Sequence, residues 1–158
     1  MFIKCFTWIC FYFIQENFIL DPIRDFFISE YSYGKIYISP QILHKDPFSI
    51  RIWGNGTETI SYNQNEWVKQ YNNEISLYEI ETNSSEEFYK QFLNDSERIY
   101  QLLFSKNNLS TTVGSTTLNY YDGVVESMTI NDFVDEEDEI EGLNVCRFEF
   151  NCTLSRVT

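Results

Sequence analysis

The segment LNVCRFEFNCTLS, residues 143–155, alternates between apolar and polar side chains at every second position. Successive side chains of a β-strand point to opposite faces of a sheet, so this period predicts a strand with one buried and one polar face. The expected buried side chains are Cys146, Phe148, Phe150, Cys152 and Leu154, and the opposite set is Val145, Arg147, Glu149, Asn151 and Thr153. Such a strand needs neighbouring strands and an apolar layer over one face, which limits the chain to a sheet-containing fold.

The neighbouring strands show the same period. KIYISP and FSIRIW alternate, and so does EISLYEI, with Ile75, Leu77 and Glu79 on one face. GNGT, residues 54–57, separates FSIRIW from TETISY, and Asn-Gly is the preferred pair of a type I′ hairpin turn. We therefore expect a hairpin with its turn at Asn55-Gly56. A second turn is expected at Asp122-Gly123, between STTLNYY and VVESMTI.

Two segments near the N-terminus predict helices. Residues 2–20 are apolar with a loose helical rhythm, although their Cys, Phe and Ile content suits a strand as well. Asp21 and Pro22 form a helix start signal, with Asp21 as the N-cap and Pro22 in the first turn. The second helix is expected to end near Gly34.

Two further helices are predicted in the middle of the chain. NQNEWVKQYNN, residues 63–73, fits about three helical turns with Trp67, Val68 and Tyr71 facing inward. The longest helix, about 84–106, begins with a capping box of Ser84 and Glu87. Its apolar stripe is Phe88, Phe92, Ile99, Leu102 and Leu103, and Glu86, Lys90, Asp95 and Glu97 lie elsewhere on its surface.

These elements predict one α+β domain over residues 1–158, a mostly antiparallel sheet with helices packed on one face. The N-terminal helical and apolar part covers about 1–33, and a sheet-rich remainder contains the long helix at about 84–106. The chain has 158 residues, of which 43% are hydrophobic, enough to bury a core without disulfides or metal. No internal repeat and no linker rich in Pro, Gly or Ser divides it.

The chain is strongly acidic, with a formal net charge of −13. Residues 1–79 contain 9 acids and 6 bases, which give −3, and residues 80–158 contain 15 acids and 5 bases, which give −10. Such a surface repels nucleic-acid phosphates and anionic lipid, so neither is an expected partner. A basic protein partner is favoured electrostatically. The alternative is that the charge serves solubility only.

The densest acidic segment is NDFVDEEDEIEG, residues 131–142. Its carboxylates are Asp132, Asp135, Glu136, Glu137, Asp138, Glu139 and Glu141. A calcium-binding EF-hand loop is not expected, because Phe133 and Val134 stand where polar ligands belong and Gly142 is misplaced. The segment is either a solvated loop before the last strand or a contact surface for a partner rich in Lys and Arg. Glu81, Glu86 and Glu87 are candidates to join that surface.

Cysteine spacing bears on metal binding and redox state. The cysteines are Cys5, Cys10, Cys146 and Cys152. Neither C-x4-C nor C-x5-C matches a zinc site, and the one histidine, His44, is distant in sequence from both pairs, so no metal and no cofactor are expected. A bridge between the N-terminal and C-terminal pairs stays open. The favoured interpretation is four buried thiols in a reduced compartment.

The first residues imitate a signal peptide, since Lys4 precedes the apolar run CFTWICFYFI. That run is too short to span a bilayer, and no small-x-small cleavage site follows it. A core element and a cytoplasmic location are therefore expected, with an export signal as the alternative. In that alternative, the N-x-[ST] sequons at Asn55, Asn83, Asn94, Asn108 and Asn151 would suit a secreted glycoprotein.

No sequence signature names a reaction. The G-x-S-x-G motif, the Walker A loop and the dinucleotide-binding fingerprint are all absent from the sequence, and His44 lies in a predicted loop. A small enzyme that uses two carboxylates, with or without a divalent metal, is a minor alternative. We expect a protein without catalytic activity.

In size, acidity and lack of a catalytic motif, the chain resembles the immunity proteins of bacterial toxin systems and phage-encoded inhibitors that imitate nucleic acid. The resemblance implies an inhibitor or antidote that caps a basic partner, such as a nuclease-type toxin or another nucleic-acid-binding enzyme. The acidic residues named above would then face the basic cleft of that partner. The alternative function is a structural or assembly subunit of phage or adaptor type.

Overall fold

A computed structural model of the chain describes residues 14–32, 34–39, 46–81, 85–131 and 142–157. In chain order its elements are the π-helical turn η1 (Glu16–Leu20), α2 (Asp21–Glu30), β1 (Lys35–Ile38), β2 (Phe48–Tyr62), β3 (Glu66–Ile80), α3 (Glu86–Ser105), β4 (Leu109–Val113), β5 (Thr116–Ile130) and β6 (Leu143–Val157). The strands form one six-stranded sheet in the order β1-β2-β3-β6-β5-β4. Only β1 and β2 are parallel neighbours; the other pairs are antiparallel.

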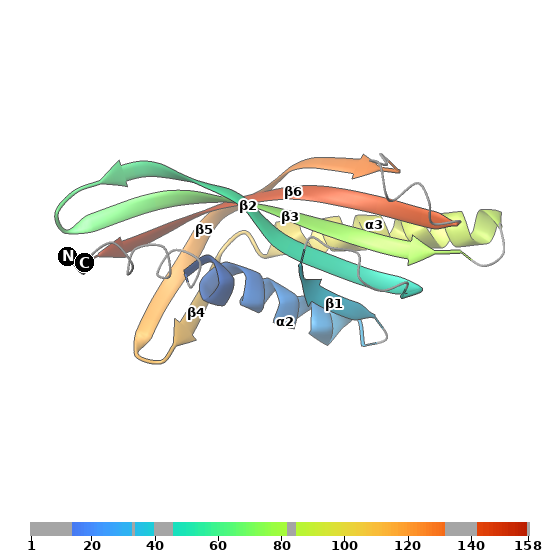
Figure 1. Cartoon of the computed structure of the whole chain (residues 1–158), viewed down its shortest axis with the longest axis horizontal. Helices are drawn as coiled ribbons and strands as arrows, with labels where there is room; N and C mark the ends of the chain where they lie inside the picture. Colours follow the sequence, from blue (N-terminus) through green and yellow to red (C-terminus); the bar gives the residue numbers. More distant parts are fainter. Residues whose placement is uncertain (1–13, 33, 40–45, 82–84, 132–141, 158) are drawn as a thin grey trace, which may run out of the picture.

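The sheet curls into a half-barrel, and the fold is broadly α+β, as expected, with strands dominating (Figure 1). The alternation of β6 is confirmed, since Phe148, Phe150 and Leu154 have no exposed surface. Ile23 and Phe27 of α2, Phe92 and Ile99 of α3, and this face of β6 belong to one apolar cluster. That cluster defines the helix-covered face of the sheet. In the described parts of the chain, no helix is long and apolar enough to cross a membrane.

The segment expected as a helix at residues 63–73 is instead the start of β3. Its side chains alternate between buried and half-buried positions, with Trp67, Lys69 and Tyr71 on the buried side. A turn at residues 63–65 connects β2 to β3, because the Asn63 side-chain oxygen accepts hydrogen bonds from the backbone N–H groups of Asn65 and Glu66, at 2.9 and 2.8 Å. This Asx-type turn sets the hairpin, and the helical prediction was wrong.

Both glycine turns predicted from the sequence are β-bulges inside long strands. β2 runs straight through Asn55-Gly56, with a register shift between Gly54 and Gly56. β5 likewise runs through Asp122-Gly123, where Asp122 has a φ of 53° and the Gly123 N–H donates to the Asn107 carbonyl at 2.8 Å. A Cβ on Gly123 would lie 2.9 Å from Asn107 Cα, so glycine is needed for this close approach. Both turn predictions were wrong.

α2 begins at Asp21 with Pro22 in its first turn, as predicted, but the predicted N-cap role of Asp21 is wrong. The chain is helical from Ile14 to Glu30, and Asp21 has helical backbone angles and donates its N–H to the Glu16 carbonyl. Pro22 has no N–H to offer to the preceding turn, and the wider π turn just before it accommodates that loss. Residues 1–13 of the predicted first helix lie outside the described residues.

α3 matches the predicted long helix in position and in its buried stripe. Its N-cap is Ser85, whose side-chain oxygen accepts the Phe88 N–H at 3.1 Å; the predicted capping residue, Ser84, lies outside the described residues. Arg98 donates to Glu30 from two nitrogens, at 2.9 and 2.7 Å, and so connects α3 to the end of α2.

Candidate functional site

The acidic surface predicted from the sequence falls on two parts of the molecule. Residues 132–141, which hold Asp132, Asp135, Glu136, Glu137, Asp138, Glu139 and Glu141, lie outside the described residues. Glu86 and Glu87 are the first residues of α3, and Glu81 directly follows β3. Glu81 accepts the Ser85 N–H, and Glu86 pairs with Lys90, so both are engaged within the chain. Carboxylates at a helix N-terminus also stabilise the helix itself, and these three carry no separate sign of a partner.

A groove of about 220 Å³ lies mainly on the face of the sheet that neither α2 nor α3 covers, and Asn73, whose side chain points to the other face, forms part of its lining. Its lining residues are Asn55, Asn72, Asn73, Glu126, Glu149 and Asn151. The strand register brings these residues together. Asn72 of β3 is paired with Gly56 of β2 on one side and with Asn151 of β6 on the other. Glu126 is added from the bulged part of β5.

One wall of the groove is a closed hydrogen-bond network. Trp53 Nε1–H donates to Asn55 Oδ1 at 3.0 Å, and Asn55 Nδ2 donates to Glu74 Oε2 at 3.2 Å. The other oxygen of Glu74 accepts the Ser76 hydroxyl at 3.2 Å and lies 3.6 Å from Arg147 Nε. Glu74 therefore carries little uncompensated charge, and Asn55 is held in a fixed orientation.

The floor and far side of the groove are not satisfied in this way. Asn151 is only 8% exposed and its carboxamide makes no hydrogen bond within the described residues. Asn72 Oδ1 is fully buried and likewise has no partner there. Glu126 and Glu149 are exposed and form no ion pair with any described residue. Buried carboxamide oxygens normally find partners, so Asn72 Oδ1 is an acceptor that the described residues leave unused, close to two exposed carboxylates.

Charge around the groove is acidic because most basic side chains are used elsewhere. Among the described residues, Arg24 pairs with Asp21 and Asp25, Lys90 with Glu86, Arg98 with Glu30 and Arg147 with Glu74. Lys69 and Lys106 lie over the rings of Trp67 and Phe26. Arg51 is 2% exposed and lies between the rings of Tyr37 and Tyr78, 5.4 and 5.3 Å from their centroids. These contacts leave Glu126 and Glu149 without balancing charge.

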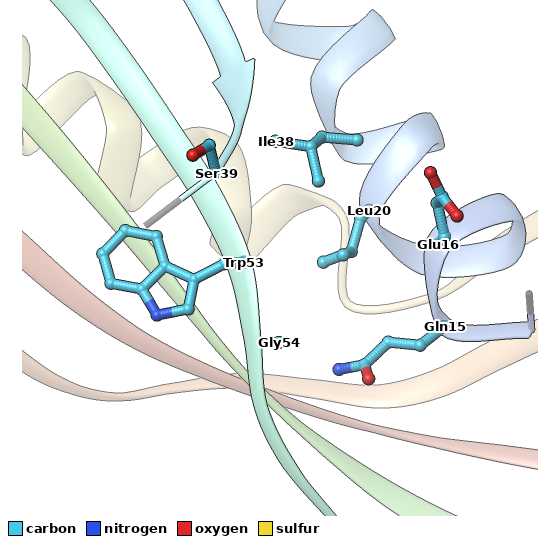
Figure 2. Close-up of a pocket in the computed structure, with 7 residues that line it drawn as sticks. All are labelled: Gln15, Glu16, Leu20, Ile38, Ser39, Trp53 and Gly54. Carbon is cyan, nitrogen blue, oxygen red and sulfur yellow. The ribbon is translucent and has the colours of Figure 1, made fainter. Parts of the chain in front are cut away.

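A second hollow, of about 320 Å³, lies where β1 ends beside the exposed edge of β2. Figure 2 shows Gln15, Glu16 and Leu20 on the helical side and Trp53 and Gly54 on the strand side. Gln15 donates to Asn73 Oδ1 at 3.0 Å and is therefore committed to the fold. Apart from Glu16, the pocket has no charged lining group, so it provides little to orient a ligand.

A buried pair of carboxyl groups joins β3 to α3. Glu79 is 3% exposed, and its Oε1 has no hydrogen-bond partner among the described residues. Burial raises the pKa of Glu79 to about 8, and the charge of Asp95 beside it adds to the shift. Burial raises the pKa of Asp95 as well. Asp95 was expected on an unrelated part of the helix surface, and the structure corrects that expectation.

The pair lines neither of the two cavities described above. It is a proton-holding contact between sheet and helix, and its consequence is for stability. Within the described residues, no cluster of three or more His, Cys, Asp or Glu side chains could hold a metal ion.

Two of the four cysteines are described, and both are free and buried, in agreement with the expected apolar role. Burial raises the pKa of Cys146 to about 11 and that of Cys152 to about 12, so neither is a reactive thiolate. Cys5, Cys10 and His44 lie outside the described residues.

Sequence reasoning placed Glu149 and Asn151 on the polar face of their strand but did not identify them as a site. The usable signal was the repetition of carboxamides and carboxylates on facing strands, in YNNE (71–74) and in FEFN (148–151). No protein-family model matches the chain, and no curated protein matches it significantly.

Proposed function

We propose that this chain is a non-catalytic acidic binding protein that caps a basic protein partner, as an inhibitor or antidote. A nuclease-type toxin, whose cleft must be basic to hold nucleic acid, is the kind of partner that fits. The observation that carries the proposal is the groove, where two exposed carboxylates without ion-pair partners among the described residues stand beside the nearly buried Asn151 and the unpartnered Asn72 Oδ1.

The distribution of charge supports the same proposal. Most described Lys and Arg side chains are engaged within the molecule, so a partner meets carboxylates rather than ion pairs. Opposite charge on a partner raises the association rate, and a desolvated carboxylate paired with a base contributes to specificity. A catalytic role has less support, because the one carboxyl pair with a strongly raised pKa lies away from every described pocket.

The test is a capture experiment with two variants of equal net charge. The wild-type chain, immobilised, should retain a basic protein from its host at low and moderate salt. The double variant E126Q/E149Q should lose affinity by about tenfold or more, since each charged hydrogen bond contributes about 1.5–3 kcal/mol. The control variant D25N/E97Q removes the same charge from the exposed surfaces of α2 and α3 and should bind as wild type.

Equal weakening by both variants would show that only net charge matters, and the groove would not be the contact. Replacement of Asp135, Glu136, Glu137, Asp138 and Glu139 by Asn or Gln tests the remaining acidic surface. That change should slow association and flatten the salt dependence of binding if those residues contribute, because they would act through long-range attraction.

A second candidate, a structural or assembly subunit, is supported by a different observation. β1 pairs only with residues 49–52 of β2, so the outer edge of β2 at residues 54–62 has no neighbouring strand in the described parts. Ile60 and Tyr62 on this stretch are 58% and 76% exposed, and the β2–β3 hairpin extends beyond the helices in Figure 1. Exposed edges with apolar side chains pair readily with other chains.

Sedimentation equilibrium separates the two candidates. A protein of 18.9 kDa that stays monomeric without its partner supports the inhibitor. A stable complex of identical chains, dispersed by I60S/Y62S, supports the assembly subunit.

A further inference from the structure

We propose that the groove receives the guanidinium group of one arginine side chain from the partner protein. The inference rests on the proposed function and names the chemical group that the groove recognises. The side chains that would hold it are Glu126, Glu149, Asn151 and Asn72.

The groove needs a cation that donates several hydrogen bonds. Its uncommitted groups are two carboxylates, which only accept, and two carboxamides, each of which accepts through its oxygen. The other two lining residues are committed: Asn55 to Trp53 and Glu74, and Asn73 to the carbonyls of Tyr71 and Phe150. An anion or an apolar group would leave all four uncommitted side chains unsatisfied and would add repulsion.

The arrangement of the acceptors favours a planar fork over a point charge. Glu126 and Glu149 come from the neighbouring strands β5 and β6, and Asn151 is two residues after Glu149 on β6. A guanidinium group has five N–H donors in one plane, so it can donate to acceptors on both strands at once. An ammonium group has three donors around one atom and is more strongly hydrated, so it loses more on entering the groove.

The sheet itself leaves room for a flat group. Gly56 is paired with Asn72, and a Cβ at this position would touch only Asn72 Nδ2, at 4.0 Å. The surface beside Asn72 is therefore free of a side chain. Asn72 Oδ1 faces inward without a partner. A half-turn of its carboxamide would bring the oxygen to the groove, where a guanidinium N–H could donate to it, and would place the nitrogen at the buried position that the oxygen now occupies.

The experiment compares two capped peptides, acetyl-Gly-Gly-Arg-Gly-Gly-amide and its Lys counterpart, titrated into the isotope-labelled full chain and followed by NMR. The Arg peptide should shift the side-chain amide signals of Asn72 and Asn151 saturably. The Lys peptide should bind at least about fivefold more weakly, because it lacks the bidentate contact. E126Q/E149Q should abolish the shifts, and D25N/E97Q should leave them unchanged.

A steric variant separates shape from charge. G56T fills the space beside Asn72 and alters no charge, so it should weaken the Arg peptide about tenfold while the basic partner is still attracted at low salt. Equal affinity for Arg and Lys peptides would overturn the guanidinium assignment and leave the proposed function standing. Shifts by the Arg peptide away from the groove would also overturn it. If the chain binds neither peptide and retains no basic protein in the capture experiment, the proposed function fails as well.

Discussion

The two faces of the sheet place opposite demands on neighbouring residues of the same strand. On β6, Phe148, Phe150 and Cys152 are at most 1% exposed under the helices. Glu149, one position away from two of them, is exposed on the helix-free face. The covered face excludes water along its length. The opposite face is mixed: it is buried around Tyr78 and Val145 and exposed around Glu149, where a polar group is not needed by the fold.

Polar residues on the covered face show the contrast most clearly. Asn73 is 1% exposed, and its carboxamide donates to two backbone carbonyls, both at 3.2 Å, and accepts from Gln15. Asn72, the next residue, points to the open face and leaves its oxygen without a partner. Of these two neighbouring carboxamides, one is satisfied within the fold and the other leaves an acceptor unused. Unpartnered atoms also occur on the covered face, at Tyr71 Oη and Glu79 Oε1.

The largest effect should come from breaking the covered face. Phe148→Ala removes a fully buried ring from the centre of the apolar cluster and should lower the free energy of unfolding by about 3–5 kcal/mol. Glu149→Ala, one residue away, should change it by less than about 0.5 kcal/mol. Urea unfolding of both variants measures the difference.

If Phe148→Ala does not fold, Phe148→Leu keeps most of the volume and should still cost about 1 kcal/mol. A loss in Glu149→Ala as large as that in the Phe148 variant would show that the open face contributes to stability, and the contrast between faces would be wrong.

A smaller effect, dependent on pH, should come from Glu79 on the covered face. Its pKa is raised from 4.5 to about 8 by burial and by Asp95, so the folded chain holds a proton that the unfolded chain releases above about pH 4.5. The stabilisation is complete below that pH and is lost as pH rises through about 8. Glu79→Gln should therefore match wild type near pH 4.5 and exceed it by about 2–4 kcal/mol at pH 8.

The measurement is the difference in unfolding free energy between Glu79→Gln and wild type at several pH values. Taking the difference cancels the titration of the many exposed carboxylates. A flat difference for Glu79→Gln would mean that Glu79 is ionised and solvated in the folded chain.

The sequence predicted the covered face better than it predicted where strands turn. Period-two alternation identified which side of β6 and β2 faces the main apolar cluster, as Phe148 and Ile50 show. It did not predict that Arg51 and Val145, on the opposite side, are buried as well. The two Gly dipeptides failed for a common reason. Asn-Gly and Asp-Gly allow left-handed or crowded backbone, which a β-bulge requires as much as a hairpin turn does. Only the pairing of whole strands distinguishes the two cases.

The same limitation explains why the groove was missed. Its residues come from β2, β3, β5 and β6, and their proximity follows from the strand order, which joins β6 to both β3 and β5. Glu126 reaches the groove from a bulge whose position no local pattern fixed. The contiguous acidic segment at 132–141 was visible to sequence analysis because it needs no tertiary structure to be recognised.

The smallest expected effect on stability comes from the open face and distinguishes stability from function there. Gly56→Thr replaces glycine in a strand, at a position whose φ is not positive and where a Cβ meets no atom closer than 4.0 Å. Glycine in a strand costs about 0.5–1 kcal/mol, so the variant should be more stable by about that amount. Thermal unfolding measures the gain, and the Arg peptide titration measures the loss of binding on the same sample. A variant that is more stable but binds the Arg peptide more weakly would show that Gly56 serves binding at a cost in stability. A variant that binds as well as wild type would show that the space beside Asn72 has no role in recognition.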